Sequence, residues 1–175
     1  AQVGGRKLAE FFYIPGIALG TSAATFSSQN FGAGERARIA KGARSGIFMY
    51  FCWWLVALVF VIFLAPTAVK FITGSSNPEV IKNGVLYLRI SIPMIPPMAI
   101  LVILRNILQG MRRPGMPLFC SCLELIGKVI FALWLVPAFG YLAVCICEPV
   151  TWVICCVVIA VAVFAIRGEF TNRHI

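Results

Sequence analysis

The sequence is poor in charged residues, and poorest in acidic ones. Charged residues make up 12% of the 175 residues, and six acidic residues stand against fifteen lysines and arginines. An average soluble domain is about one quarter charged. Together with a hydrophobic content of 61% and a mean hydropathy of +0.94, this scarcity excludes an ordinary soluble domain and indicates a membrane protein.

Residues that hold metals or carry out redox chemistry are scarce or unsuitably placed. His174 is the single histidine and lies in a polar tail. All the cysteines fall inside apolar segments, and they are Cys52, Cys120, Cys122, Cys145, Cys147, Cys155 and Cys156. A Cys-x-Cys pair on a helix points its two thiols about 200° apart. We therefore expect the thiols to pack as small apolar groups, and we predict neither a metal nor a cofactor.

Two further absences argue against an enzyme. The sequence Gly32-Ala33-Gly34 follows no strand and precedes no Gly-Lys-Ser/Thr, so it is not a nucleotide-binding loop. A membrane-embedded thiol oxidoreductase would need exposed, paired cysteines at a helix end or in a loop, whereas these lie within apolar runs. We predict no catalytic residues.

Long apolar runs fill the chain instead. Residues 47–66, IFMYFCWWLVALVFVIFLAP, hold no charge, and about 20 apolar residues in a helix cross the hydrocarbon core. The alternating pattern of barrel strands is absent, and a backbone in hydrocarbon must satisfy its own hydrogen bonds, so the runs are helices. We predict an all-α integral membrane protein, a polytopic bundle of five transmembrane helices at about 9–31, 44–66, 80–110, 117–137 and 140–166.

Basic residues gather in alternate loops, which predicts the topology. The rich side holds Arg36, Arg38, Lys41, Arg44, Arg105, Arg112, Arg113, Arg167 and Arg173. By the positive-inside rule this side is cytoplasmic, which predicts a multi-pass protein of the cell inner (plasma) membrane with a cytoplasmic C-terminus. Residues 35–45 are expected to form a short interfacial helix whose basic face meets lipid headgroups, so we expect membrane lipid and no nucleic acid as a partner.

The start of the chain lacks an initiator Met and a signal peptide. Arg6 and Lys7 lie on the side that should be poor in positive charge. An upstream span would explain both features, so we expect the chain to be an excerpt from a longer protein.

The first predicted span is rich in small and polar residues. A small residue recurs every four positions at Gly16, Gly20, Ala24 and Ser28, which predicts close approach of another helix. Candidates for lining a cavity or gate on this span are Thr21, Thr25, Gln29 and Asn30. Two roles are open for this face. Either it only packs, with its hydroxyls bonded to carbonyls of their own helix, or it lines a water-filled cavity.

The third span contains three prolines in five residues, Pro93, Pro96 and Pro97. Proline removes a helix hydrogen bond and forces a kink, so the helix must break or bend here. Discontinuous helices at this depth form sites and gates in transporters, and we favour that role over a static packing kink.

Intramembrane charges are the candidates for ion coupling. Glu124 and Lys128 are four residues apart on one helix, which favours a mutual ion pair. Glu148 has no local cation and is the better carboxylate to titrate, while Arg89 can snorkel or meet Glu148 from the neighbouring helix. Because buried charge is costly in a membrane, these groups should face protein or water. They would then form either a proton or cation relay or an ion pair that joins helices.

Three segments, in order, carry a resemblance to a known family. They are SSQNFGAGERARIAKGAR, ILRNILQGMRRPGMP and PAFGYLAVCICEPVTW. They resemble the loop after the second helix, the end of the fourth helix and the closing helix of one half of the multidrug and toxic compound extrusion (MATE) transporters. The resemblance implies that the five spans correspond to helices 8–12 of a twelve-helix, two-lobe transporter. The N-terminal lobe and the first helix of this lobe are then expected elsewhere in the same polypeptide.

The resemblance also implies a function. Family members are antiporters in which inward H⁺ or Na⁺ flow drives export of small amphiphilic, often cationic compounds by alternating access. Acidic residues of the seventh and tenth helices carry the ion in many members, but the tenth-like segment 85–110 has no Asp or Glu. Coupling then falls to Glu148, Glu124 or the missing part. The alternative is a lipid-linked oligosaccharide flippase of the same superfamily, with a larger and more basic cavity.

Overall fold

The computed structural model describes residues 2–74, 77–166 and 168, and all the regular secondary structure in them is helical. The prediction of an all-α fold is therefore confirmed. The main elements are α1 (Gln2–Gly32), α2 (Arg36–Thr73), α3 (Pro78–Ser91), α4 (Ile95–Gly110), α5 (Gly115–Ile130), α6 (Val136–Phe139) and α7 (Tyr141–Ala165). A 3₁₀ turn, Ile92–Met94, joins α3 to α4, and a π-helical segment, Phe131–Leu135, joins α5 to α6.

Four helical stretches of the described chain are long and apolar enough to cross a membrane. They are Arg36–Thr73, Pro78–Gly110, Gly115–Phe139 and Tyr141–Ala165. Large apolar side chains such as Phe63 and Trp134 point outward, as a lipid-facing surface requires. Helix α1 has 31 residues and is long enough, but its more polar composition leaves it outside this group, so its crossing stays a prediction.

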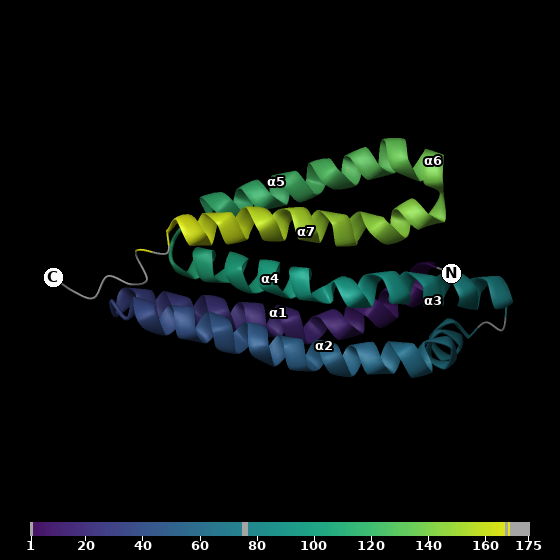
Figure 1. Ribbon diagram of the computed structural model, residues 1–175, viewed down its shortest axis with the longest axis horizontal. Helices are drawn as coiled ribbons and strands as arrows, with labels where there is room; N and C mark the ends of the chain where they lie inside the picture. The colour runs from purple at the N-terminus through teal and green to yellow at the C-terminus, as the bar shows by residue number, and fades with distance from the viewer. Residues whose placement is uncertain (1, 75–76, 167, 169–175) are drawn as a thin grey trace.

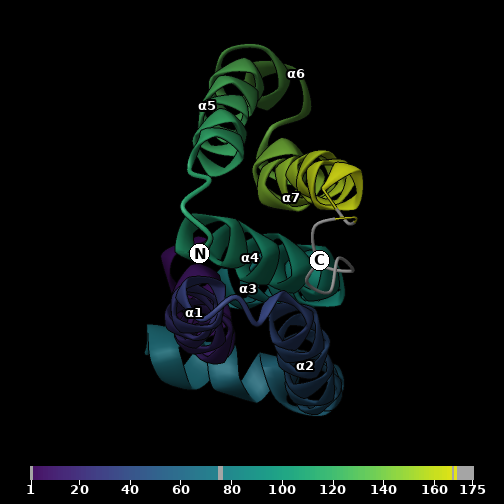
Figure 2. The ribbon, with the colours of Figure 1, turned by 90° about the vertical axis from the view of Figure 1, so that its left-hand side faces the viewer.

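The helices form a layered bundle. The pair α5 and α7 lies on one side, α1 and α2 lie on the other, and α3 and α4 run between them (Figures 1 and 2). Helix α4 packs against both α1 and α7. The turns that follow α1 and α4 lie at the same end of the molecule as the end of α7 (Figure 1).

Helix α2 begins earlier than the sequence indicates. The expected interfacial helix at 35–45 is not separate, because residues 36–45 form the first turns of α2 and continue into the apolar span. The segment RARIAKGARS contains no proline that would end a helix, so the helix continues from headgroup level into the hydrocarbon. The basic residues consequently lie on a rigid extension of a transmembrane helix.

The small-residue stripe of α1 brings it close to its neighbours, as predicted. A Cβ added at Gly20 would lie 2.8 Å from Val102 Cγ1 of α4, and one added at Gly16 would lie 2.7 Å from the Tyr50 ring of α2. A Cβ at Gly110 of α4 would collide with the backbone carbonyl of α1. These glycines set the separation between helices.

The predicted break at the prolines is present. Helix α3 ends at Ser91, and α4 begins at Ile95 after one 3₁₀ turn. Since Pro96 has no N–H, the Ile92 carbonyl lacks its usual α-helical donor and accepts instead from the Ile95 N–H within the 3₁₀ turn. The indole Nε1–H of Trp54 in α2 donates to this carbonyl at 2.9 Å. The broken backbone is therefore satisfied by protein, as a membrane interior demands.

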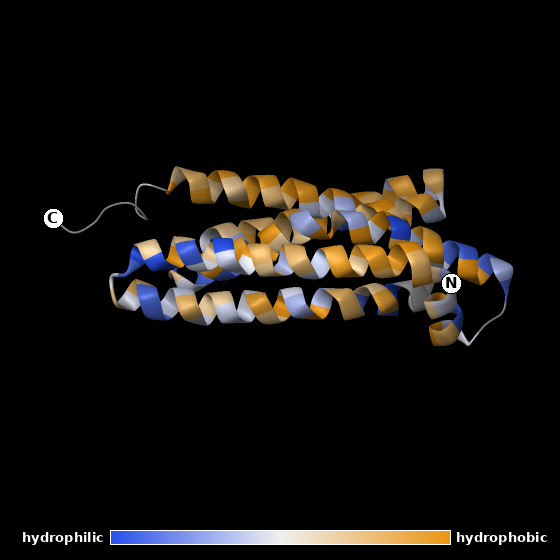
Figure 3. Cartoon of the chain, turned by 60° about the horizontal axis from the view of Figure 1, so that its bottom comes forward, coloured by the Kyte–Doolittle hydropathy of each residue, from blue (hydrophilic) through white to orange (hydrophobic). Residues whose placement is uncertain are grey.

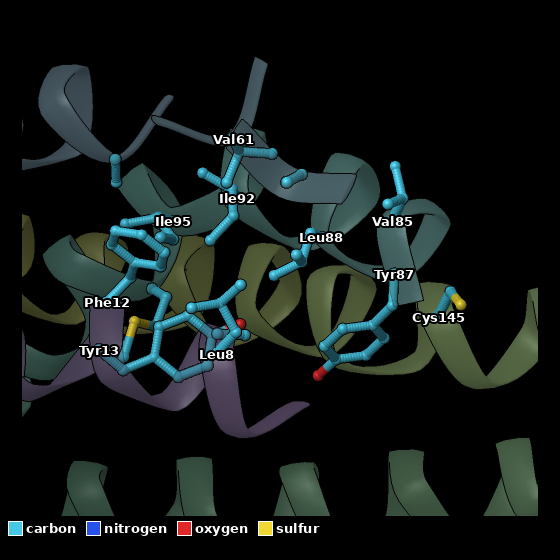
Figure 4. Close-up of a cluster of buried hydrophobic side chains, with 14 of the residues drawn as sticks. Leu8, Phe12, Tyr13, Val61, Val85, Tyr87, Leu88, Ile92, Ile95 and Cys145 are labelled. Carbon is cyan, nitrogen blue, oxygen red and sulfur yellow. The ribbon is translucent and has the colours of Figure 1, made fainter. Parts of the chain in front are cut away.

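The same stretch of α2 also bonds to the backbone of α1. The Tyr50 hydroxyl and the Trp53 indole both donate to the Phe12 carbonyl, at 3.2 and 3.1 Å. Figure 4 shows Phe12 in the largest buried cluster, with Leu88, Ile92 and other side chains of α1, α2, α3 and α4. This cluster fixes the end of the bundle that carries the candidate site.

Candidate functional site

Glu148 lies in a cavity of about 370 Å³ where α1, α3, α5 and α7 meet. The Tyr87 hydroxyl of α3 donates to Glu148 Oε2 at 3.0 Å. Arg6 of α1 and Lys128 of α5 line the same cavity. The site thus combines one carboxylate, one phenol and two cations from four different helices.

Irregular helix geometry shapes the wall of this cavity. The π-helical segment supplies Phe131 and Ala132, and Val136 follows at the start of α6. A π-helical turn widens the helix and is frequent at functional sites. The apolar remainder of the wall keeps the carboxylate in surroundings where electrostatic interactions are stronger than in water.

The charges of the site interact with each other. Arg6 forms an exposed ion pair with Glu10, its Nε lying 3.2 Å from Oε1. The carboxylate of Glu148 is the largest influence that raises the pKa of Arg6, which lies before the predicted span at 9–31. With Lys128 also at the cavity, Glu148 faces more positive than negative charge.

Two hydroxyls close to the site have no hydrogen-bond partner in the described part of the chain. They are the buried Tyr13 OH and Ser91 Oγ. The ring of Tyr13 packs edge-on against Trp152 of α7, with the ring centroids 5.5 Å apart. Buried polar groups usually find a protein or water partner, so these two hydroxyls are available to pair with each other or with water.

The structure corrects the expected pairing of Glu124. Its carboxylate lies 3.3 Å from the guanidinium of Arg105 on α4 and is not paired with Lys128. The second Nη of Arg105 donates to Ser121 Oγ. A forked guanidinium reaches both acceptors from the facing helix, while Lys128, one turn further along α5, lies at the Glu148 cavity. Glu124 therefore joins α4 to α5.

Of the two roles open for Arg89, the contact with Glu148 is wrong, because Arg89 lies away from that cavity. It lines a groove of about 600 Å³ between α2 and α3, together with Lys82 and Pro66. Tyr87 and Arg89 are two residues apart on one helix and so point to different faces. The phenol, and not the guanidinium, is the group that α3 presents to Glu148.

The candidates on α1 also lie apart from the site. Thr21 and Thr25 are exposed, and their hydroxyls donate to carbonyls one turn earlier in their own helix. Gln29 and Asn30 line a different groove, at the opposite end of α1 from Arg6. Pro93, Pro96 and Pro97 lie at the break between α3 and α4, just past Tyr87 in the chain. Their cavity or gating roles stay predictions.

Sequence reasoning missed Tyr87 and Arg6 as site residues. The one signal was the unexpected position of Arg6 on the side poor in basic residues, whereas nothing in the sequence distinguishes Tyr87. Sequence reasoning on cysteine pairs in one helix also missed that Cys120 and Cys155 meet across α5 and α7. The described residues contain no His, Cys, Asp and Glu cluster able to hold a metal. His174, Arg167 and Arg173 lie outside the described residues.

These features define a multi-pass helical membrane protein with a charged site between its helices. The model of the MatE family matches residues 3–134, which is well over half of the chain. The chain belongs to this family, and the family implies a transporter rather than an enzyme. The match includes α1 to α5 with Lys128, and it ends before α7, which carries Glu148. No curated protein matches the chain.

Proposed function

We propose that this protein is a proton-coupled antiporter that exports small amphiphilic compounds from the cell by alternating access. The observation that supports the proposal is the Glu148 carboxylate, held by the Tyr87 hydroxyl in a cavity between four helices. A titratable group between packed helices can have different proton affinities in two conformations, and such a difference is what couples an ion to a conformational change.

The number of oxygen ligands in the site favours H⁺ over Na⁺ as the coupling ion. Sodium is held by several oxygen atoms, whereas the described lining of this cavity offers the Glu148 carboxylate and the Tyr87 hydroxyl beside the cations Arg6 and Lys128. A proton needs only one carboxylate oxygen. A site with a single carboxylate is therefore better suited to exchange a proton than to hold sodium.

Protonation of Glu148 would act on α3 and α1. A neutral carboxyl group loses its attraction for Arg6 and accepts a weaker hydrogen bond from Tyr87. Tyr87 lies about one turn before the break at Ile92–Met94, so a change at its hydroxyl reaches the discontinuous part of the span. Rigid-body movement about such a break is a known way to alternate access.

The membrane orientation belongs to the same proposal. Arg38 and Lys41 after α1, and Arg112 after α4, lie at one end of the bundle, the end at which α7 also finishes (Figure 1). By the positive-inside rule this end would face the cytoplasm, and we take the inner (plasma) membrane as the location of the protein. The transport cycle would use the N-terminal lobe expected in the same polypeptide, because alternating access requires two bodies that move against each other.

The test is dye efflux from inverted membrane vesicles that carry the protein expressed from its complete gene. We expect efflux of a cationic dye under an imposed pH gradient, loss of efflux when that gradient is collapsed, and no support from a sodium gradient alone. Glu148→Gln should abolish the pH-driven efflux at unchanged protein level, while the exposed control Glu35→Gln should retain it.

Three results would count against the proposal. Full activity of Glu148→Gln would remove this residue from coupling, and efflux driven by Na⁺ would replace the coupling ion. Absence of efflux in well-inserted wild-type protein would favour the flippase, and lipid-linked sugars would be the next substrates to measure.

A further inference from the structure

A groove lies between the end of α1 and the start of α2, far along the bundle from Glu148. Its walls come from one face of each helix, because the lining residues of each helix are three or four positions apart in the sequence. Its volume is about 780 Å³, and its walls are Phe26, Gln29, Asn30 and Ala33 of α1 and Arg38, Lys41, Gly42 and Ser45 of α2.

The groove is suited to an anion. Arg38 and Lys41 lie one turn apart on the same face of α2, and no acidic side chain is among the walls. The amide side chains of Gln29 and Asn30 face them from α1. Asn30 uses one of its two amide hydrogens on the Phe26 carbonyl at 2.7 Å, so its other N–H, the Gln29 amide, the Ser45 hydroxyl and the two cations are the donors that remain for a ligand.

An apolar cavity adjoins the basic groove. A second cavity of about 240 Å³ shares Phe26, Gly42 and Ser45 with the first and extends toward the middle of the bundle, where Leu19 and Met49 form its walls. The ribbon is strongly hydrophilic at the hairpin between α1 and α2 and becomes apolar further along both helices (Figure 3). The two cavities together have one charged end and one apolar end.

A buried hydroxyl lies in the apolar part without a partner. Ser27 is 1% exposed, its Oγ has no hydrogen-bond partner in the described part of the chain, and it lines the apolar cavity. A buried hydroxyl without a bond is costly, and a ligand oxygen at that depth would satisfy it. This observation is independent of the charges at the mouth.

We propose that the groove between α1 and α2 binds one anionic phospholipid. The phosphate lies between Arg38 and Lys41 and an acyl chain lies along Leu19 and Met49, while a glycerol ester carbonyl accepts a hydrogen bond from Ser27. A free phosphate ion would fill only the charged end, so the adjoining apolar cavity favours the lipid as the source of the anion. Helix α2 carries the basic residues as a rigid extension, so the site needs no rearrangement to form.

The test measures lipid binding to the purified full-length protein in detergent by native mass spectrometry. Dioleoylphosphatidylglycerol is the anionic probe, dioleoylphosphatidylcholine is the neutral comparison, and inorganic phosphate is the competitor. The site variant is Arg38→Gln with Lys41→Gln. The control is Arg44→Gln with Arg112→Gln, which removes the same charge from the same end of the protein outside the groove.

We expect the wild type and the control to retain one phosphatidylglycerol in preference to phosphatidylcholine. The site variant should bind phosphatidylglycerol about 30-fold more weakly, since each basic residue near a lipid surface contributes roughly 1 kcal/mol. Ser27→Ala should weaken retention less, by about fivefold, as expected for one hydrogen bond.

Three outcomes would overturn the proposal. Equal retention of the two lipids would show that the headgroup charge is not recognised. Equal losses in the site variant and the control would show attraction by overall charge and not by a groove. Displacement of the lipid by millimolar inorganic phosphate would make free phosphate the ligand.

Discussion

Replacement of Glu124 with Gln is expected to destabilise the protein and to leave transport intact, because Glu124 is part of an ion pair between helices. Its carboxylate lies 3.3 Å from Arg105, and both side chains are 23% exposed. Removal of one partner of a buried pair costs about 3–5 kcal/mol. Since Arg105 keeps its bond to Ser121 and the pair is partly exposed, we expect a loss of about 2–3 kcal/mol. For 175 residues this corresponds to a fall in melting temperature of roughly 4–12 °C, and to a smaller fall in the longer polypeptide that we expect.

The assay is a double-mutant cycle on melting temperature in detergent, with Glu124→Gln, Arg105→Gln and the double variant, and with dye efflux measured on each. The double variant should lose less than the sum of the single losses, because it leaves no unpaired charge behind. Losses that add to within about 0.5 kcal/mol would refute the pairing. A Glu124→Gln protein with normal stability and no efflux would instead make Glu124, and not Glu148, the titrating residue.

Two further predictions concern the packing of the bundle and the broken helix. Gly110→Ala should lower the free energy of unfolding by about 1–3 kcal/mol, because the added Cβ would meet the Ala24 carbonyl. The control Gly115→Ala adds its Cβ to open space and should change the free energy of unfolding by less than about 0.5 kcal/mol. Equal melting temperatures of the two variants would contradict the close contact. Replacement of Pro96 and Pro97 together with Ala should slow dye efflux more than it lowers the melting temperature, because it restores helix at the break. A fall in stability with normal transport per molecule would make the break structural.

The local structure of this chain could be predicted because the bilayer limits the possibilities. An apolar run of about 20 residues must be a helix, three clustered prolines must break it, and a stripe such as Gly16, Gly20 and Ala24 must face another helix. Each of these statements depends only on residues that are neighbours in the sequence. The same reasoning placed Glu148 and Lys128 inside the membrane, next to protein or water.

The partners of the charged residues could not be predicted, because they depend on which helices pack together. Periodicity within one helix favoured Lys128 for Glu124, but the packing of α4 on α5 supplies Arg105. Periodicity also could not show that Tyr87, and not Arg89, contacts Glu148, since that contact depends on how α3 is rotated against α7. Local rules describe one helix, whereas an intramembrane site is assembled from several.

Proton release on substrate binding tests the role of Glu148 most directly. The full-length protein, purified in weakly buffered detergent solution with a pH indicator, receives a cationic dye. We predict that the wild type and Glu124→Gln release protons when the dye binds, and that Glu148→Gln binds the dye without proton release. Proton release from Glu148→Gln equal to that of the wild type would contradict the account, because the exchanged proton would then come from another group.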